Sequence, residues 1–325
     1  MVLPIYNAGA CANSPALLTL DTDHSVFLQD AANRDHMWLM ARLSNDVPSW
    51  TGFNILTHNN TSVQEDSIGY LPSINAPATQ LSMVNEVLNQ SISIMKSLQL
   101  NNIVVVFDQA LYAKAAEITW KHQQLLKDII LRMGVFHTTC NFMATIGKRF
   151  GDAGLRDLCV EAGVIADGSI SGVIDGHRYN RAVRLHKLLY EAFLRLAWKG
   201  FLPWIEENHQ EDVIHLEATL QAVDNLCEEV SQTRFEGALD QESSQRILTR
   251  FNEYLSYLRL NNGPLSAFWM SYVDMVEVVL ALLRASREGK WLMHLAAIRT
   301  IIPWCFAYDK LNYARYLTYF YAQMS

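Results

Sequence analysis

Two short apolar runs near the middle of the chain give the clearest structural signal. Residues 103–107 (IVVVF) end abruptly at Asp108, and residues 129–133 (IILRM) end at Gly134. Short apolar runs that are bounded by polar residues or glycine are typical of strands buried on both faces. The segment 109–126 between them has a helical pattern, and it is long enough to return the chain for a parallel second strand. The pattern therefore predicts a βαβ unit.

The ends of these two predicted strands mark the first place to look for chemistry. In a parallel sheet the carboxyl ends of the strands open on the functional crevice. Asp108 follows the first strand, and His137 comes shortly after the second. We therefore expect both side chains on one rim.

The rest of the chain predicts a small amount of further strand and a large helical half. Upstream we expect an irregular lead-in over 1–33, a short helix over 34–44, a strand over 50–57 and a hairpin partner over 67–71. Apolar residues recur with a helical period over 79–98. After Phe150 the strand signal ends, and helices are expected over 154–162, 178–206, 212–231, 236–260, 265–288, 290–301 and 306–323, with a loop-rich stretch between 163 and 176. The predicted fold class is an α-rich α/β protein.

Composition narrows the class of protein further. The chain has 325 residues, half of them hydrophobic, and a net charge of −7, so a basic field over the whole chain is absent. Five dispersed cysteines without a CxxC pair indicate reduced thiols, as in a nuclear or cytoplasmic protein. We find neither a signal peptide pattern nor an uninterrupted apolar run of membrane-spanning length, so we expect an intracellular protein without a membrane partner.

Asp108 and His137 each have two interpretations. The Asp108 carboxylate at the end of a buried strand can hold a divalent metal, but its position also suits a cap for the following helix. His137 is either a base beside Asp108 or a structural, buried histidine. Cys140 lies one helical turn after His137, but no second His/Cys pair with matching spacing completes a zinc site.

Acidic residues late in the chain are candidates for a further metal ligand. Asp274 and Glu277 lie one turn apart in the apolar segment 265–283. The alternative is an outward-facing stripe that they share with Arg284 and Glu288. Asp309 follows an apolar segment, and it is either an additional acid or a helix cap.

Basic residues gather around 148–149 and along the predicted helix 178–206. They can follow the phosphates of a nucleic acid, or they can form a solvated helix face with intrahelical ion pairs. The candidates for nucleic-acid contact are Lys148, Arg149, Arg181, Arg184 and Lys187. The chain lacks P-loop, GxGxxG, GxSxG and HExxH motifs, which argues against the commonest nucleotide-binding and hydrolase classes.

Several longer stretches resemble a known family. They are VVVFDQALYAKAAEITWK, IILRMGVFHTTCNFMATIGKRFGDAGLRDLCVEAGV, YNRAVRLHKLLYEAF and FAYDKLNYARYL. They resemble an uncharacterised family of animal proteins, often present in many copies, that is related to a domain carried by transposable elements of fungi and animals. The resemblance covers about residues 48–325, and the strings GVFHT and NYARYL are its most specific parts.

The resemblance implies a transposase-type core with the ribonuclease-H-like fold. In that fold, acids from the first strand, the fourth strand and a late helix hold two metal ions, Mg²⁺ or Mn²⁺, for phosphodiester chemistry. Asp108 would be the fourth-strand acid, Asp309 the late acid, and Glu277 its alternative. The implied organisation is a lead-in with a short helix over 1–47, the first part of the core over 48–150, a helical insertion over 151–264, and C-terminal helices that return to the core over 265–325.

The chain departs from this pattern at the first strand. Its candidate, residues 50–55 (WTGFNI), contains no carboxylate. We therefore expect a degenerate or inactive transposase-like domain that binds nucleic acid or protein partners and needs no cofactor. The alternatives are an active metal-dependent nuclease or transposase that uses Asp108, Asp309, Glu277 and His137 with DNA as its substrate, and a helical protein-interaction scaffold.

Overall fold

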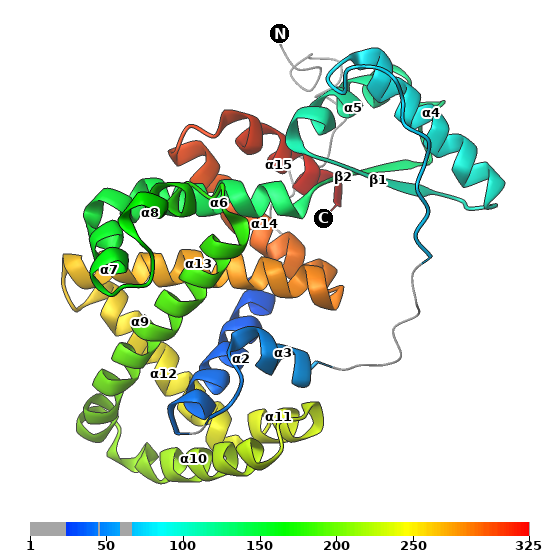
Figure 1. The fold of residues 1–325 in the computed structure, drawn as a ribbon. Coiled ribbons are helices and arrows are strands. Elements are labelled where there is room, and N and C mark those ends of the chain that lie inside the picture. Colours follow the sequence, from blue (N-terminus) through cyan, green and yellow to red (C-terminus); the bar gives the residue numbers. More distant parts are fainter. Residues whose placement is uncertain (1–23, 45, 59–66, 325) are drawn as a thin grey trace. The chain divides into compact units, whose positions relative to one another are not determined.

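Helices dominate the computed structural model, which describes residues 24–44, 46–58 and 67–324 (Figure 1). The chain divides into two compact units. Among the described residues, the strand unit comprises 67–145 and 298–324, and the helical unit comprises 24–44, 46–58 and 146–297. Each unit is described by itself below.

The strand unit contains the predicted βαβ arrangement. Strands β1 (Ile103–Phe107) and β2 (Ile129–Met133) pair in parallel, with Ile103 opposite Ile129 and Phe107 opposite Met133. Helix α5 (Gln109–Lys121) connects them. Helices α4 (Leu81–Ser97) and α15 (Leu311–Met324) also pack against the strands. The predicted strand boundaries and the parallel pairing are confirmed.

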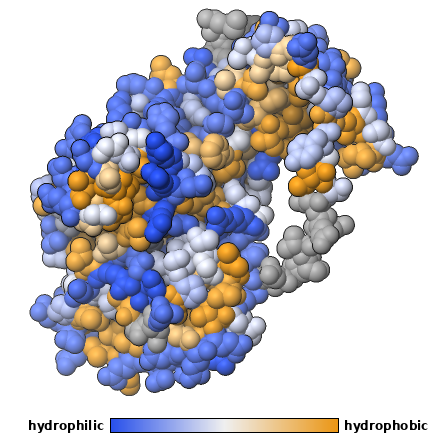
Figure 2. All heavy atoms as spheres, viewed as in Figure 1, coloured by the Kyte–Doolittle hydropathy of each residue, from blue (hydrophilic) through white to orange (hydrophobic). Residues whose placement is uncertain are grey.

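Only one face of this small sheet is buried. Leu131 and Met133 are buried, whereas Val104 and Val106 on the other face are 51% and 58% exposed. The expectation of strands buried on both faces is therefore wrong, because α4, α5 and α15 leave the second face uncovered. Figure 2 shows apolar side chains at the surface of the strand unit around these strands.

The helical unit is built around one long apolar helix, α13 (Pro264–Glu288). Helices α2, α9 and α12 pack against it. The bounds of the other helices in this unit are α2 Ser25–Ser44, α3 Trp50–Leu56, α7 Arg156–Glu161, α8 Asp167–Ile174, α9 Tyr179–Asn208, α10 Val213–Glu228, α11 Gln232–Leu239 and α12 Glu242–Leu260. Helices α6 (Val135–Phe150) and α14 (Trp291–Ala307) continue from one unit into the other.

The length and composition of α13 would also suit a membrane span. However, 56% of its most apolar stretch is buried inside the helical unit. This is the burial expected of a core helix, and it is compatible with the predicted absence of a membrane partner.

The largest error of prediction concerns residues 50–57, which form helix α3 instead of a strand. The strand prediction relied on alternation at Phe53, Ile55 and Thr57. In the structure Trp50 and Phe53, one helical turn apart, are the buried pair, and Ile55 is 63% exposed. The helical period therefore decides which side chains reach the core.

Three smaller corrections also concern where elements begin and end. Helix α2 starts at Ser25, so the irregular lead-in is wrong over 25–33, while residues 1–23 lie outside the described part of the chain. Residues 67–71, predicted as a hairpin partner, form no strand. The predicted loop between 163 and 176 contains α8, and the predicted helix 236–260 is divided between α11 and α12.

A glycine in α6 provides a test of packing in the helical unit. A Cβ atom on Gly147 would lie 2.2 Å from the backbone oxygen of Ile174, which cannot move without shifting α8. We expect Gly147→Ala to lower the free energy of unfolding by about 1–3 kcal/mol, measured by urea denaturation. The control is Gly237→Ala in α11, where nothing lies within 4 Å of the added atom. There the better helix propensity of alanine should leave stability unchanged or raise it by up to ~1 kcal/mol. Equal losses in both variants would contradict this packing.

Candidate functional site

The rim at the end of β1 contains Asp108, and the structure gives this residue a capping role. Its Oδ1 accepts a hydrogen bond of 2.9 Å from the backbone N–H of Leu111, in the first turn of α5. Tyr313 of α15 lies within electrostatic reach of the same carboxylate. Burial, with a smaller contribution from Asp108, raises the pKa of Tyr313 to about 12. The cap interpretation of Asp108 thus describes its local geometry.

The other residues predicted for this rim each have a setting of their own, and among the described residues Asp108 belongs to no group of three His, Cys, Asp or Glu ligand atoms within 4.8 Å of one another. His137 is exposed in the first turn of α6 and contacts its neighbour Phe136 edge-on, so the buried-histidine interpretation is wrong. Asp309 is exposed and has a left-handed backbone (φ 56°) after α14, rather than a capping position on α15. Glu277 belongs to α13 in the helical unit.

Within the described part of the chain, one group of three His, Cys, Asp or Glu side chains has its ligand atoms within 4.8 Å of one another. It consists of His209, Glu211 and Asp212. Asp212 is fully buried, and Arg246 and Arg250 each bind one of its carboxylate oxygens. Burial opposes ionisation of Asp212, but the two guanidinium groups hold its pKa below the usual range. A metal ion would have to displace them, so these residues do not form a convincing metal site.

The most unusual polar feature of the helical unit is a buried ion pair. Arg284 of α13 is 2% exposed, and its Nη2 lies 2.5 Å from Oδ1 of Asp35 in α2. The same guanidinium donates to the carbonyl of Ala31 at 2.9 Å and to Oδ1 of Asn54 at 2.8 Å. The indole N–H of Trp50 donates to Asp35 at 2.7 Å. Together these bonds join α2, α3 and α13.

This arrangement corrects the prediction of an outward-facing stripe on α13. The side chains of Arg284 and Glu288 are only 1% and 8% exposed, and Glu277 accepts a hydrogen bond of 3.2 Å from Tyr190 of α9. The fourth member, Asp274, pairs with Arg259 of α12 at 2.6 Å. Glu277, Arg284 and Glu288 thus turn inward, whereas the side chain of Asp274 remains 44% exposed.

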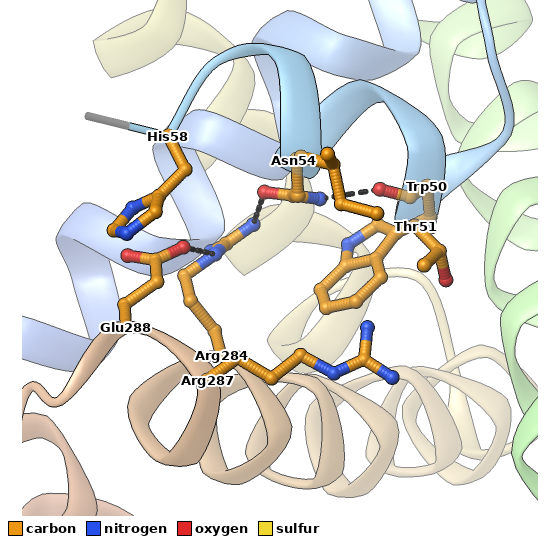
Figure 3. Close-up of a pocket in the computed structure, with 8 residues that line it drawn as sticks. Trp50, Thr51, Asn54, His58, Arg284, Arg287 and Glu288 are labelled. Atoms are coloured by element: carbon orange, nitrogen blue, oxygen red, sulfur yellow. Dashed lines mark hydrogen bonds and ion pairs between the residues drawn. The ribbon is translucent and has the colours of Figure 1, made fainter. Parts of the chain in front are cut away.

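A cavity of about 170 Å³ opens beside this network, between α3 and α13 (Figure 3). Its walls are formed by Trp50, Thr51, Asn54, Ile55, His58, Arg284, Arg287 and Glu288. A second cavity of about 420 Å³ shares Trp50 and Thr51 with the first and is lined by Arg184 and Lys187 of α9. We call these two neighbouring cavities together the Trp50 cleft.

Lys187 lines the larger cavity of the Trp50 cleft. Its Nζ donates to the Thr51 hydroxyl at 2.6 Å and lies 4.3 Å from the centroid of the Trp50 ring. Burial lowers the pKa of Lys187 to about 8; the nearby Arg287 acts in the same direction, and Asp35 opposes it. Lys187 is thus partly desolvated in positive surroundings.

The five basic residues predicted to contact nucleic acid have different environments. Arg184 and Lys187 line the Trp50 cleft, and Arg181 is exposed one turn earlier on α9. Arg149 donates to Ser271 and lies against Phe150 and Phe268, whereas Lys148 is exposed. The predicted intrahelical pairing on α9 occurs between Arg195 and Glu191, at 2.8 Å.

The sequence did not indicate four of the residues that line the cavities, namely Trp50, Thr51, Asn54 and Arg287. Trp50, Thr51 and Asn54 belong to a segment predicted as a strand, and no local pattern distinguishes Arg287.

Comparison with known families gives one match. A family model described as "Domain of unknown function (DUF8702)" matches residues 49–325, which is most of the chain. The chain belongs to this family. No curated protein matches it, and no solved structure does. Membership of the DUF8702 family therefore leaves the function to be argued from the geometry above.

The buried pair provides a stability test. Asp35→Asn removes the charge that balances Arg284 and should lower the free energy of unfolding by about 3–5 kcal/mol. The control is Glu236→Gln, the same chemical change at the partly exposed pair with Arg34 (2.8 Å), where a loss of at most ~1 kcal/mol is expected. Urea denaturation measures both. A loss at Asp35 no larger than the loss at Glu236 would show that the buried pair does not hold α2 to α13.

Proposed function

We propose that this chain is a transposable-element-derived, transposase-like protein whose ribonuclease-H-like core is degenerate, and that it binds nucleic acid without cutting it. The observation that carries the proposal is a set of cations on α9 and α13 without acidic partners. Among the described residues, Arg181, Arg184, Lys187 and Arg287 make no ion pair. Unpaired cations that gather in a chain of net charge −7 favour a polyanionic partner.

The degenerate core is supported by the positions of the acids. A βαβ unit with Asp108 directly after a strand, followed by a long helical stretch, is the part of the implied core that the described residues contain; Asp108 follows the first described strand, whereas the resemblance assigns it to the fourth. Residues 50–55, the candidate first strand, form a helix and supply no carboxylate. Asp108 itself caps α5. Two-metal phosphodiester chemistry needs several acids on one site, and among the described residues Asp108 belongs to no group of three ligand atoms within 4.8 Å of one another, which favours binding over catalysis.

The exposed part of α9 offers a surface that can follow a phosphate backbone. Arg181, Arg184 and Lys187 are spaced by three residues, which places them on neighbouring positions of one helix face. Contacts from such residues to phosphates are independent of base sequence and weaken strongly with salt. We therefore propose a salt-sensitive interaction with DNA or RNA that has little sequence preference.

Charge reversal on α9 tests the proposed binding of DNA. The double variant Arg181→Glu and Arg184→Glu should bind a fluorescent DNA duplex at least about 10-fold more weakly than the wild type in anisotropy titrations. The slope of log affinity against log salt should fall by roughly 2, about 0.9 for each lost phosphate contact.

The matched control for this prediction is Lys114→Glu with Lys127→Glu in the strand unit, which makes the same change of charge. The control should bind DNA as the wild type does, apart from the small effect of net charge. If the control loses as much affinity, the α9 surface is not the binding face. If the wild type shows no salt-dependent binding of the DNA duplex, the nucleic-acid proposal is wrong, and a protein-interaction scaffold becomes the better interpretation.

A second prediction separates binding from metal-dependent catalysis. Calorimetric titration of Mg²⁺ or Mn²⁺ should give no site-specific heat with the wild type, and Asp108→Asn should give the same trace. Since asparagine also caps helices well, this variant should keep its stability, whereas Asp108→Ala should lose about 0.5–2 kcal/mol. Site-specific metal binding that disappears in Asp108→Asn would favour the active nuclease instead.

A further inference from the structure

We propose that the Trp50 cleft binds a phosphate monoester, presented either by a free mononucleotide or by the 5′ end of a nucleic-acid chain, through Arg287 and Lys187. This goes beyond the proposed binding of a nucleic-acid backbone, since a terminal phosphate carries more charge than an internal one. The two proposals can fail separately, because the α9 surface and the cavity beside α13 use different arginines.

Arg284 supplies a buried donor that the protein leaves unsatisfied. Its two terminal nitrogens bind Ala31, Asp35 and Asn54, but its Nε is buried and has no hydrogen-bond partner within the described part of the chain. The nearest acid, Glu288, lies 3.7 Å away, beyond hydrogen-bond distance. Buried charged donors without a partner are uncommon in native proteins. Because this nitrogen is buried and faces the Glu288 carboxylate (Figure 3), Arg284 forms part of the cavity wall and adds positive charge there without bonding the phosphate directly.

Arg287 and Lys187 supply the charge that this phosphate would need. Arg287 lies one turn after Arg284 on α13, is exposed, and lines the same cavity. Lys187 reaches the cleft from α9 and bonds only to the neutral hydroxyl of Thr51. Burial is the main cause of the lowered pKa of Lys187, and the positive charge of Arg287 adds to it. An anion between these groups would relieve their repulsion.

The acids near the cleft are already committed to other cations. Asp35 binds Arg284 and Trp50, and Glu288 binds Lys290 at 2.7 Å. Glu191 is shared by Arg42 and Arg195. Counting the remaining groups gives five cations (Arg184, Lys187, Arg284, Arg287 and Lys290) against two acids (Asp35 and Glu288), an excess of three positive charges. A phosphate monoester carries about −1.5 to −2 near pH 7, which this excess can balance.

The size of the cavities also favours a phosphate over a larger group. The cavity beside Arg284 has about 170 Å³, below the roughly 300–1,000 Å³ of pockets that enclose a drug-sized ligand. The cavity of about 420 Å³ on the other side of Trp50 and Thr51 is lined in part by Trp38 and Leu188. Arg287 lines the smaller cavity and Lys187 the larger one, so we place the phosphate beside Trp50 and Thr51, which line both, and the attached sugar and base in the larger cavity.

The test uses calorimetry with inorganic phosphate as the probe, at constant ionic strength and with the full chain. Arg287→Gln should weaken phosphate binding at least about 10-fold, because it removes one of the two cations proposed to bind the phosphate while leaving the Asp35–Arg284 pair intact. The matched control is Lys199→Gln, an exposed cation of α9 that lines neither cavity, and it should change the affinity less than about 2-fold. Absence of phosphate binding in the wild type, or equal affinity in the wild type and Arg287→Gln, would overturn the proposal.

Nucleic-acid probes then identify the source of the phosphate. If the phosphate belongs to a mononucleotide, adenosine monophosphate should bind more tightly than inorganic phosphate and adenosine should not bind. If it is the end of a chain, a 5′-phosphorylated oligonucleotide should bind more tightly than its 5′-hydroxyl form, and Arg287→Gln should abolish the difference. Salt-sensitive DNA binding without any preference for the 5′-phosphate would refute the cleft as a phosphate site while leaving the α9 surface intact.

The pH dependence of phosphate affinity distinguishes loss of a ligand from loss of the folded structure. Phosphate should bind less tightly as pH rises through about 8, because Lys187 then loses its proton. The charged groups near Lys187 are Arg287 of α13, Asp35 of α2, and Arg184 and Glu191 of its own helix. His58, which follows α3, is the titratable histidine that lines the smaller cavity. Lys187→Arg should bind phosphate and remove this decline, since arginine stays protonated. An unchanged pH profile in Lys187→Arg would exclude Lys187 as a ligand of the phosphate.

Discussion

The helical unit depends on one constraint, the charge of Arg284 inside its core. A guanidinium that is 2% exposed must be neutralised and hydrogen-bonded, since an unpaired buried ion is among the costliest defects in a fold. Asp35 supplies the charge, and Asn54 and the carbonyl of Ala31 supply further acceptors. These partners belong to α2 and α3, so one side chain of α13 fixes how both helices meet it. Apolar contacts alone are non-directional and would fix this arrangement less uniquely.

The same constraint produces the Trp50 cleft. Trp50 turns inward because its indole N–H reaches Asp35, and its ring then has Arg284 at 5.3 Å and Lys187 at 4.3 Å from its centroid. A ring between two cations is favourable through the cation–π interaction, but it cannot cancel their charge. Because Asp35 is already bonded to Arg284 and Trp50, the charges of Lys187 and Arg287 remain without an acidic partner among the described residues. Stability and candidate function in this unit therefore arise from the same few side chains.

The sequence predicts the strand unit better than the helical one for a physical reason. The bounds of β1, β2 and α4 follow from local patterns of apolar residues, and those patterns match the contacts the side chains make. Residues 50–57 fit two periods equally well, and the contact that decides between them, from Trp50 to Asp35, spans 15 residues. Likewise the charged stripe on α13 resembles a solvated face until α2, α9 and α12 are in place around it. Asp108 as a helix cap was among the local alternatives, whereas Arg287 acquires its setting only from the tertiary structure.

The distribution of charge also distinguishes the two candidate activities. Metal-dependent phosphodiester chemistry requires carboxylates that converge and remain free to bind cations. Here the buried acids Asp35 and Asp212 are each neutralised by arginine, and Asp108 accepts a backbone N–H. The cations show the opposite behaviour, because Arg184, Lys187 and Arg287 gather in one cleft without acidic partners among the described residues. Acids that are satisfied within the protein cannot recruit a metal ion, whereas cations that are left unsatisfied can bind an external phosphate. This distribution of charge is the reason why we propose phosphate binding for this chain in preference to metal-dependent cleavage.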